Sequence, residues 1–236
     1  FLNHFMKNIT SQTLFDRCEL IIVDAASEGN EVEIIQPYIE KYKNIIYHRI
    51  NEKLKPTPCL NEAIRISSGK CLTFALIDDV KKTNCIEMLF GHLEKNDCSL
   101  VYGDVIQVDE ENQFFEEHAG SNNVFEHSKY EFSLENMIKC LPGPMPMWYS
   151  NIHNRCGFFD DSSCDYADDW EMWLRMVSKG YRFKKLNEKV GLYLIGGRSQ
   201  QDSLEQKKEE SKIFFKYSNI FGNNYQKYYS YFKQFT

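Results

Sequence analysis

Several features that mark common protein classes are missing from this chain of 236 residues, and each absence narrows its function. Its eight cysteines form no Cys-x-x-Cys pair and no Cys/His alternation, which argues against a zinc site or disulfide scaffold and favours reduced thiols in a cytoplasm. No apolar run approaches the ~20 residues that cross a bilayer, so we expect a soluble protein. The formal net charge is −6 and no segment concentrates Lys and Arg, so no nucleic-acid partner is expected.

What is present is the alternation typical of an α/β fold. A hydrophobic share of 42% is ordinary for a globular protein with a sizeable core. Short apolar runs predict strands, and stretches with helical spacing separate them. The predicted strands cover 18–24, 45–49, 71–76 and 99–104, and the predicted helices cover 31–42, 60–67 and 85–94. This alternation predicts a doubly wound, mostly parallel central sheet flanked by helices.

Two acidic pairs stand where such a fold can use them. Asp78 and Asp79 follow a buried strand, and open α/β sheets bind ligands at the carboxyl ends of their strands. Asp168 and Asp169 begin a run with helical spacing in which Trp170 and its neighbours would face the core. Acids at a helix N-terminus also stabilise the helix through its dipole, so this pair is either a helix cap or a chemical site. One pair for a cation and one for a base would divide the chemistry between them.

Four further segments do not follow the strand–helix rhythm. Residues 105–130 are polar and weakly periodic, and so long a connection predicts a mobile lid. Residues 180–186 predict an edge strand. Residues 214–235 are rich in Phe, Tyr and Lys and predict one or two helices that pack on the domain, on a second subunit or on a membrane surface. The chain starts at Phe1 in another amphipathic helix, and we expect further sequence before it.

The order of these features resembles the family 2 glycosyltransferases, whose GT-A fold binds nucleotide sugars. Each motif is short, but the whole set follows the family's order over roughly residues 1–200. The matching positions are Gln12-Thr13, Val23-Asp24, Asn61, Gly69-Lys70, Ile77-Asp78-Asp79, Gly157-Phe158-Phe159-Asp160, Asp168-Asp169, Trp173-Leu174-Arg175 and Gly180 to Phe183.

The resemblance implies a GT-A domain over residues 1–204 and an aromatic-rich helical extension over 205–236. It implies a hexosyltransferase-type enzyme of polysaccharide biosynthesis, which moves a sugar from a nucleotide-diphosphate donor to a saccharide or lipid-linked acceptor with inversion. The implied cofactor is Mn²⁺ or Mg²⁺, because a divalent cation stabilises the charge that grows on the leaving diphosphate. We expect a cytoplasmic protein, with membrane-peripheral contact or homo-oligomer formation through the extension left open.

The resemblance also assigns roles to individual residues. Asp169 matches the family's catalytic base, and Asp168 is the neighbour whose like charge raises the pKa of that base. Asp78 and Asp79 would hold the metal. The nucleotide-binding residues that the resemblance implies are Asp24, Asn61 and Asp78.

The chain also departs from the family pattern. The family's opening strand is missing, Leu76 and Ala25 stand where acids are common, and no His follows the last strand. Arg198 and Ser199 lie in a Gly-rich loop that would close on the diphosphate, whereas Arg175 is expected to pair with an acid. Two alternatives stay open: a non-catalytic GT-A-like module that binds glycan or nucleotide, and a nucleotidyltransferase, which would need a Gly-rich phosphate loop near its start.

Overall fold

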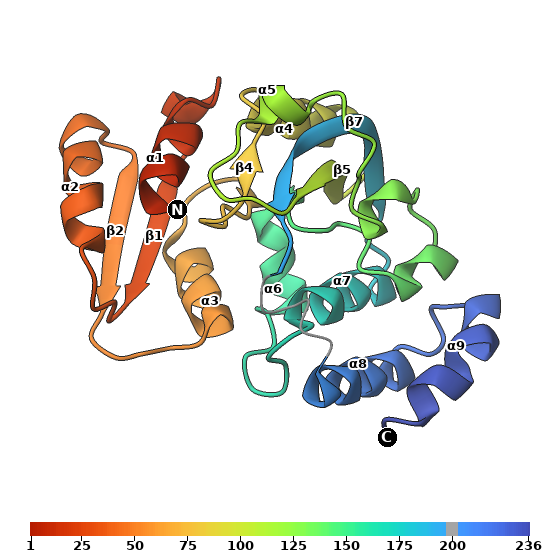
Figure 1. Ribbon diagram of the computed structural model, residues 1–236. Coiled ribbons are helices and arrows are strands. Elements are labelled where there is room, and N and C mark those ends of the chain that lie inside the picture. The colour runs from red at the N-terminus through yellow and green to blue at the C-terminus, as the bar shows by residue number, and fades with distance from the viewer. Residues whose placement is uncertain (197–202) are drawn as a thin grey trace.

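The computed structural model describes residues 1–196 and 203–236, so Arg198 and Ser199 lie outside the described residues (Figure 1). The strands are β1 (Leu20–Ala25), β2 (Ile45–Ile50), β3 (Cys71–Thr73), β4 (Val80–Lys81), β5 (Leu100–Val108), β6 (Met147–Tyr149) and β7 (Phe183–Leu194). The α-helices are α1 (Leu2–Thr10), α2 (Glu31–Lys41), α3 (Pro56–Ile66), α4 (Cys85–Lys95), α5 (Phe115–His118), α6 (His153–Cys156), α7 (Asp168–Ser178), α8 (Leu204–Lys216) and α9 (Asn223–Lys233). Short 3₁₀ helices are η1 (Phe15–Arg17), η2 (His127–Lys129), η3 (Glu135–Ile138) and η4 (Ser150–Ile152).

Within the described residues, the strands form two sheets, and their two longest pairings are parallel. β1 and β2 pair in parallel from Leu20 opposite Ile45 onward and form the smaller sheet at the left of Figure 1. The larger sheet has the order β3-β6-β5-β7-β4, and in it β5 and β7 are parallel. The pairs β3–β6, β5–β6 and β4–β7 are antiparallel and short. The predicted α/β class is confirmed, and the antiparallel pairs involve β4 and β6, two short strands that were not predicted.

The predicted edge strand at 180–186 is the first half of β7, which pairs with β5 on one side, whereas β4 pairs with β7 only at Gly191 and Leu192. The side chain of Lys185 in this half of β7 is nevertheless only 5% exposed, and its Nζ lies 3.0 Å from Oδ1 of Asp104 on β5. The two strands also approach unusually closely. A Cβ on Gly103 would lie 2.4 Å from Cγ1 of Val190, so this position accepts no side chain without displacement of β7.

Helices cover both faces of the larger sheet. Leu100 and Tyr102 of β5 face a core that contains Trp173 of α7 and Phe214 of α8. Val101, one residue along the strand, faces the opposite core, which is formed with α1 and α4. This alternation is the period-two pattern of a strand buried on both faces. The core on the Leu100 and Tyr102 face of β5 holds α7, the helix that begins with the second acidic pair.

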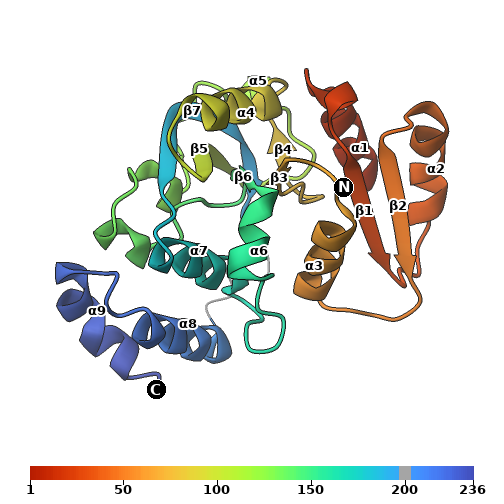
Figure 2. The same cartoon turned by 180° about the vertical axis from the view of Figure 1, so that it is seen from behind.

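The predicted aromatic, helical extension is confirmed as α8 and α9, and both helices pack on α7 (Figure 2). The Trp170 ring stacks on Phe221 and Phe232, with centroids 6.2 Å and 6.3 Å apart. The extension thus supplies part of the core around α7, whereas the domain boundary at residue 204 and contact with a second subunit or a membrane stay predictions. Across the described residues, none of the helices has both the length and the apolar character needed to cross a bilayer.

The predicted lid at 105–130 is partly regular structure. Residues up to Val108 continue β5, and Phe115 of α5 is buried. Val124 forms an antiparallel bridge with Ile106, and the Phe125 amide donates to the Val105 carbonyl at 2.7 Å. The mobility of the segment stays a prediction.

Candidate active site

Asp168 and Asp169 are the first two residues of α7, and neighbouring elements hold each carboxylate. The Thr57 hydroxyl of α3 donates to Oδ2 of Asp168 at 2.9 Å. In Asp169, Oδ1 accepts the Trp170 amide at 2.6 Å and Oδ2 accepts the Cys140 thiol at 3.2 Å. Residues from three separate parts of the sequence therefore meet at this pair.

Burial changes the acid–base behaviour of the pair. Burial, which is the largest cause, and the like charge of Asp168 together raise the pKa of Asp169 to about 6 against the opposing hydrogen bonds. Burial also raises the pKa of Asp168, although the Thr57 hydrogen bond partly opposes this. Two such carboxylates share their protons, so the titration belongs to the pair. A carboxylate with a raised pKa is a stronger base near neutral pH, as the predicted role of Asp169 requires.

The loop before the pair is held by Glu209 of α8. Its carboxylate accepts the backbone amides of Asp165, Tyr166 and Ala167 at 2.7, 2.9 and 2.7 Å. Glu209 is 9% exposed; its hydrogen bond to the Ala167 amide is buried, whereas those to the Asp165 and Tyr166 amides are partly buried. Nothing in the local sequence around Asp168 indicates this contact, because its partner comes from the helical extension.

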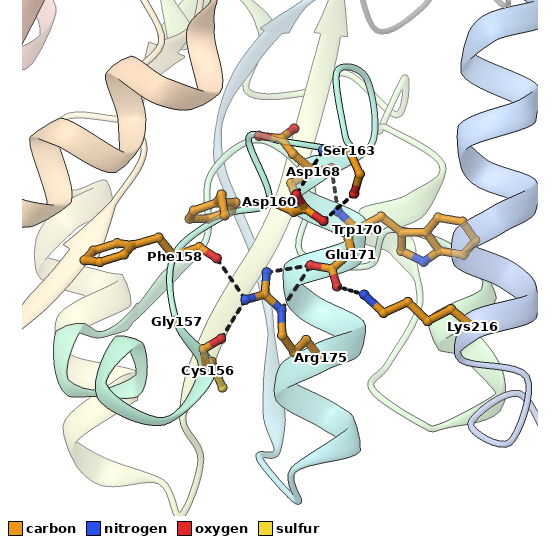
Figure 3. Close-up of polar contacts among 12 residues, drawn as sticks. Cys156, Gly157, Phe158, Asp160, Ser163, Asp168, Trp170, Glu171, Arg175 and Lys216 are labelled. Atoms are coloured by element: carbon orange, nitrogen blue, oxygen red, sulfur yellow. Dashed lines mark hydrogen bonds and ion pairs between the residues drawn. The ribbon is translucent and has the colours of Figure 1, made fainter.

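A second buried carboxylate, that of Glu171, also connects α7 and α8, but here the acceptor is on α7 and the donor is on α8 (Figure 3). Glu171 of α7 accepts Lys216 Nζ at 2.7 Å and the Tyr217 hydroxyl at 2.6 Å, from the last residue of α8 and the residue that follows it. Arg175 donates to Glu171 at 2.5 Å and also to the carbonyls of Cys156 and Phe158. Burial opposes the ionised form of Glu171, but its donors outweigh burial and hold the pKa of Glu171 below its usual value. The expectation that Arg175 pairs with an acid is confirmed.

Asn61, a predicted nucleotide-binding residue, is 1% exposed on α3. Its amide nitrogen donates to the Phe159 carbonyl at 2.9 Å and to Asp161 at 3.0 Å, and its oxygen accepts the Phe159 amide at 3.0 Å. These contacts use the side chain within the protein. Asn61 therefore fastens α3 to the loop that leads to α7, and direct contact with a nucleotide would require some of these bonds to break.

Asp24 ends β1 as predicted, but it is 5% exposed and already engaged. It accepts the Ser27 amide at 2.8 Å, Arg49 at 2.5 Å and the Tyr47 hydroxyl. Burial acts to raise the pKa of Asp24, yet these contacts outweigh it and hold the pKa low. Tyr47 and Arg49 were not among the predicted site residues, although their alternate positions on β2 place both on the face of Asp24. The Arg49 side chain is 41% exposed and offers a cation at this strand end.

The two carboxylates of the first acidic pair, Asp78 and Asp79, differ in their exposure to solvent. Asp78 is half-buried, whereas Asp79 is 6% exposed and turns inward at the start of β4. The oxygens of Asp79 have no donor in hydrogen-bond geometry among the described residues. Burial, with the Asp78 charge, raises the pKa of Asp79 to about 8 against the nearby charge of Lys81. Asp78 is thus the carboxylate of the pair that a ligand from solvent reaches.

These residues fit a cation that is bound jointly with its substrate. No group of three or more His, Cys, Asp and Glu side chains suited to a metal occurs in residues 1–196 and 203–236. Mg²⁺ in phosphate-transfer sites is usually held by one or two carboxylates together with substrate phosphates and water. Asp78 meets the protein part of that requirement. The donor diphosphate would have to supply further ligands.

A cavity of about 600 Å³ lies beside this strand end and separates the two sheets. β1 borders it with Leu20 and Ile21, and β3 borders it along its whole length. Its walls are mainly apolar, and Phe74 contributes to them while its ring centroid lies 6.1 Å from that of Trp173. The strand end that carries Asp78 is therefore linked by packed aromatic rings to the helix that carries Asp169.

The fold defined by these sheets and helices is that of the GT-A glycosyltransferases. The chain belongs to glycosyl transferase family 2, because the model of that family matches residues 1–159. The family resemblance inferred from the motifs is confirmed.

Individual relatives agree with this assignment. The chain is 25% identical over 219 residues to the uncharacterized glycosyltransferase MJ1057 of Methanocaldococcus jannaschii, covering 92% of this chain and 73% of that protein. S. aureus TarS 1–349 in complex with UDP-GlcNAc has a TM-score of 0.73 at 13% identity, covering 98% of this chain and 69% of that one. The mannosyltransferase PcManGT from Pyrobaculum calidifontis, solved with GDP-Man and Mn²⁺, has a TM-score of 0.66 at 16% identity, covering 92% and 60%. The two structural likenesses show the fold alone.

Proposed function

We propose that this chain is a metal-dependent, inverting glycosyltransferase with Asp169 as its catalytic base. The observation that carries the proposal is the carboxylate pair at the start of α7, where Asp169 is half-buried, both of its oxygens accept hydrogen bonds, and its pKa is raised to about 6. Family membership supports sugar transfer, and the nucleotide sugars in the solved relatives support a nucleotide-diphosphate donor.

On the donor side, Asp78 is the residue that would hold a divalent cation with the diphosphate. When bound, Mn²⁺ or Mg²⁺ neutralises the charge that develops on the leaving phosphates. Manganese in the solved mannosyltransferase supports this choice of cofactor. Asp24 would orient the nucleoside through the network it forms with Tyr47 and Arg49, and Asn61 would act by holding the loop ahead of α7.

On the acceptor side, Asp169 takes the proton from the attacking hydroxyl. The acceptor oxygen then forms a bond to the anomeric carbon while the carbon–phosphate oxygen bond breaks and its electron pair leaves with the nucleotide diphosphate. Direct displacement inverts the anomeric centre. Asp168 keeps the pair basic through its charge. The acceptor proposed from the family is a saccharide or a lipid-linked sugar, and the eight free thiols suit a cytoplasmic location.

One observation favours the alternative, a non-catalytic GT-A-like module. Leu76 and Ile77 are 46% and 53% exposed at the strand end, where the family commonly has an acid at the first of these positions. With Asp79 turned inward, only Asp78 is open to a cation. Such a protein would bind a nucleotide or glycan without turnover.

A donor screen with a base variant separates the two functions. A panel of nucleotide sugars is incubated with acceptors with and without Mn²⁺, and release of the nucleotide is measured. The enzyme predicts transfer with at least one donor and an Asp169→Asn rate loss of about 10²–10⁴-fold with donor binding retained. Asp109→Asn is the matched control, because Asp109 is exposed at the end of β5. Nucleotide binding without transfer by the unaltered chain would favour the module.

A further inference from the structure

Cys140 lies in a closely packed loop that faces the start of α7. The loop connects η3 to β6, and the neighbouring Leu141 is fully buried. The Gly143 amide donates to the Cys140 carbonyl at 3.2 Å, and the Leu141 amide donates to the Lys139 carbonyl at 2.9 Å. Pro142 fixes its own backbone φ angle within this turn. The backbone that carries the Cys140 side chain is therefore held by turn hydrogen bonds and by the buried Leu141.

The thiol of Cys140 donates to Oδ2 of Asp169 over 3.2 Å. Because Oδ1 of Asp169 accepts the Trp170 amide, both oxygens of this carboxylate are oriented by the protein. Burial, together with the charge of Asp169, raises the pKa of the Cys140 thiol well above its usual value. The thiol thus keeps its proton near neutral pH and can act as a donor to the ionised carboxylate.

We propose that Cys140 is a positioning residue for sugar transfer, holding the Asp169 carboxylate in the orientation and ionisation state in which it accepts the acceptor's proton. The proposal rests on the proposed function of Asp169 as the base. A donor to a carboxylate stabilises the ionised form, so Cys140 opposes the burial and the Asp168 charge that favour the protonated form. Among the described residues, Glu209 of α8 also acts on the pair, because its charge raises the pKa of Asp168.

Two variants of Cys140 make opposite predictions for the pH dependence of transfer. Cys140→Ala removes the donor, so Asp169 should become harder to ionise and the acidic limb of the kcat/KM profile should move up by about one pH unit. Well below that limb, kcat/KM should fall about tenfold, while the rate on the alkaline plateau should change much less. Cys140→Ser supplies a hydroxyl donor in place of the thiol and should keep the limb at or below its original pH.

Cys98→Ala serves as the matched control, because Cys98 is half-buried in the turn before β5 and lies outside the described site. It should leave the profile unchanged. A general structural defect would lower the rate of both Cys140 variants at every pH without moving the limb. The proposal is overturned if neither Cys140 variant moves the limb, or if both move it in the same direction.

A second measurement does not depend on activity and so separates this proposal from the proposed function. The infrared S–H stretching band of Cys140 is assigned as the difference between the unaltered protein and Cys140→Ser. The band should move to higher frequency in Asp169→Asn, because the acceptor loses its charge, and should not move in Asp109→Asn. An unmoved band in Asp169→Asn would refute the hydrogen bond itself, whereas a moved band without any sugar transfer would refute only the proposed function.

Discussion

Replacing Glu209 with Ala should destabilise the protein much more than an ordinary substitution on a helix surface. The change leaves the amides of Asp165, Tyr166 and Ala167 without their common acceptor. Hydrogen bonds to a charged group contribute about 1.5–3 kcal/mol each, but the first two amides are only partly buried, so water can replace part of their loss. The free energy of unfolding should therefore fall by about 3 kcal/mol.

For a chain of this length, a loss of that size corresponds to a fall in Tm of about 6–12 °C. Urea and thermal denaturation would measure it, with Glu205→Ala as the matched control because Glu205 is an exposed acid in the first turn of the same helix. Removing Glu205 forfeits only a helix-dipole contribution of about 0.3–1 kcal/mol. The loss in the free energy of unfolding for Glu209→Gln should lie between those for Glu209→Ala and Glu205→Ala, since the Gln amide oxygen still accepts a hydrogen bond.

Catalysis should respond to the same change. Because the released loop leads directly into Asp168, kcat should fall at a temperature where the variant remains folded, while donor binding at the β1 and β3 ends persists. If Glu209→Ala unfolds with the stability of Glu205→Ala, the three amides are satisfied in another way and the reasoning is refuted. If stability falls but kcat does not, Glu209 supports the fold without orienting the acidic pair.

Three further outcomes are expected. Asp78→Asn should weaken manganese-dependent binding of a nucleoside diphosphate in calorimetry far more than Asp79→Asn, because Asp79 is turned inward; equal losses would place both carboxylates on the metal. The transfer rate should rise as pH increases through about 6, since Asp169 must lose its proton to act as the base; a rate independent of pH between 5 and 8 would contradict this role. Trp170→Ala should lower the free energy of unfolding by about 3–5 kcal/mol, because it removes a buried ring stacked on Phe221 and Phe232, and chemical denaturation would show a smaller loss if the extension does not pack on α7.

The sequence pattern predicted a helix or strand correctly wherever the residues of that element alone determined its structure. The helical spacing of Trp170 and Trp173 placed α7 correctly, with the acids at its first turn. β4 was not predicted, because two residues are too few to show a period. The burial of Lys185 could not be predicted, because a buried lysine looks the same in the sequence as an exposed one and the carboxylate that it contacts, Asp104, lies on another strand.

The contacts that tune the site were less accessible to sequence analysis, since they join residues far apart in the chain. Cys140 gave no signal, because nothing around it indicates that Asp169 will lie beside its thiol. Asn61 matched a family motif, yet the match could not show that the loop at Phe159 already uses its amide. For Tyr47 and Arg49, the sequence offered one weak indication of their contact with Asp24, namely the strand alternation that puts both on one face of β2.

The parallel pairing of β5 with β7 bears on the order in which the molecule is assembled. β1 and β2 are close in sequence, with α2 between them, and can pair as soon as this βαβ unit has been synthesised. Leu100 must wait for Phe183, and closing so long a loop is slow because its entropy is lost before the contacts form. On a ribosome, α8 emerges later still, so the carboxylate that fastens the loop before Asp168 arrives near the end of synthesis. The part of the fold around β1 and β2 should thus acquire its shape early, and the part around Asp168 and Asp169 only when nearly the whole chain is available.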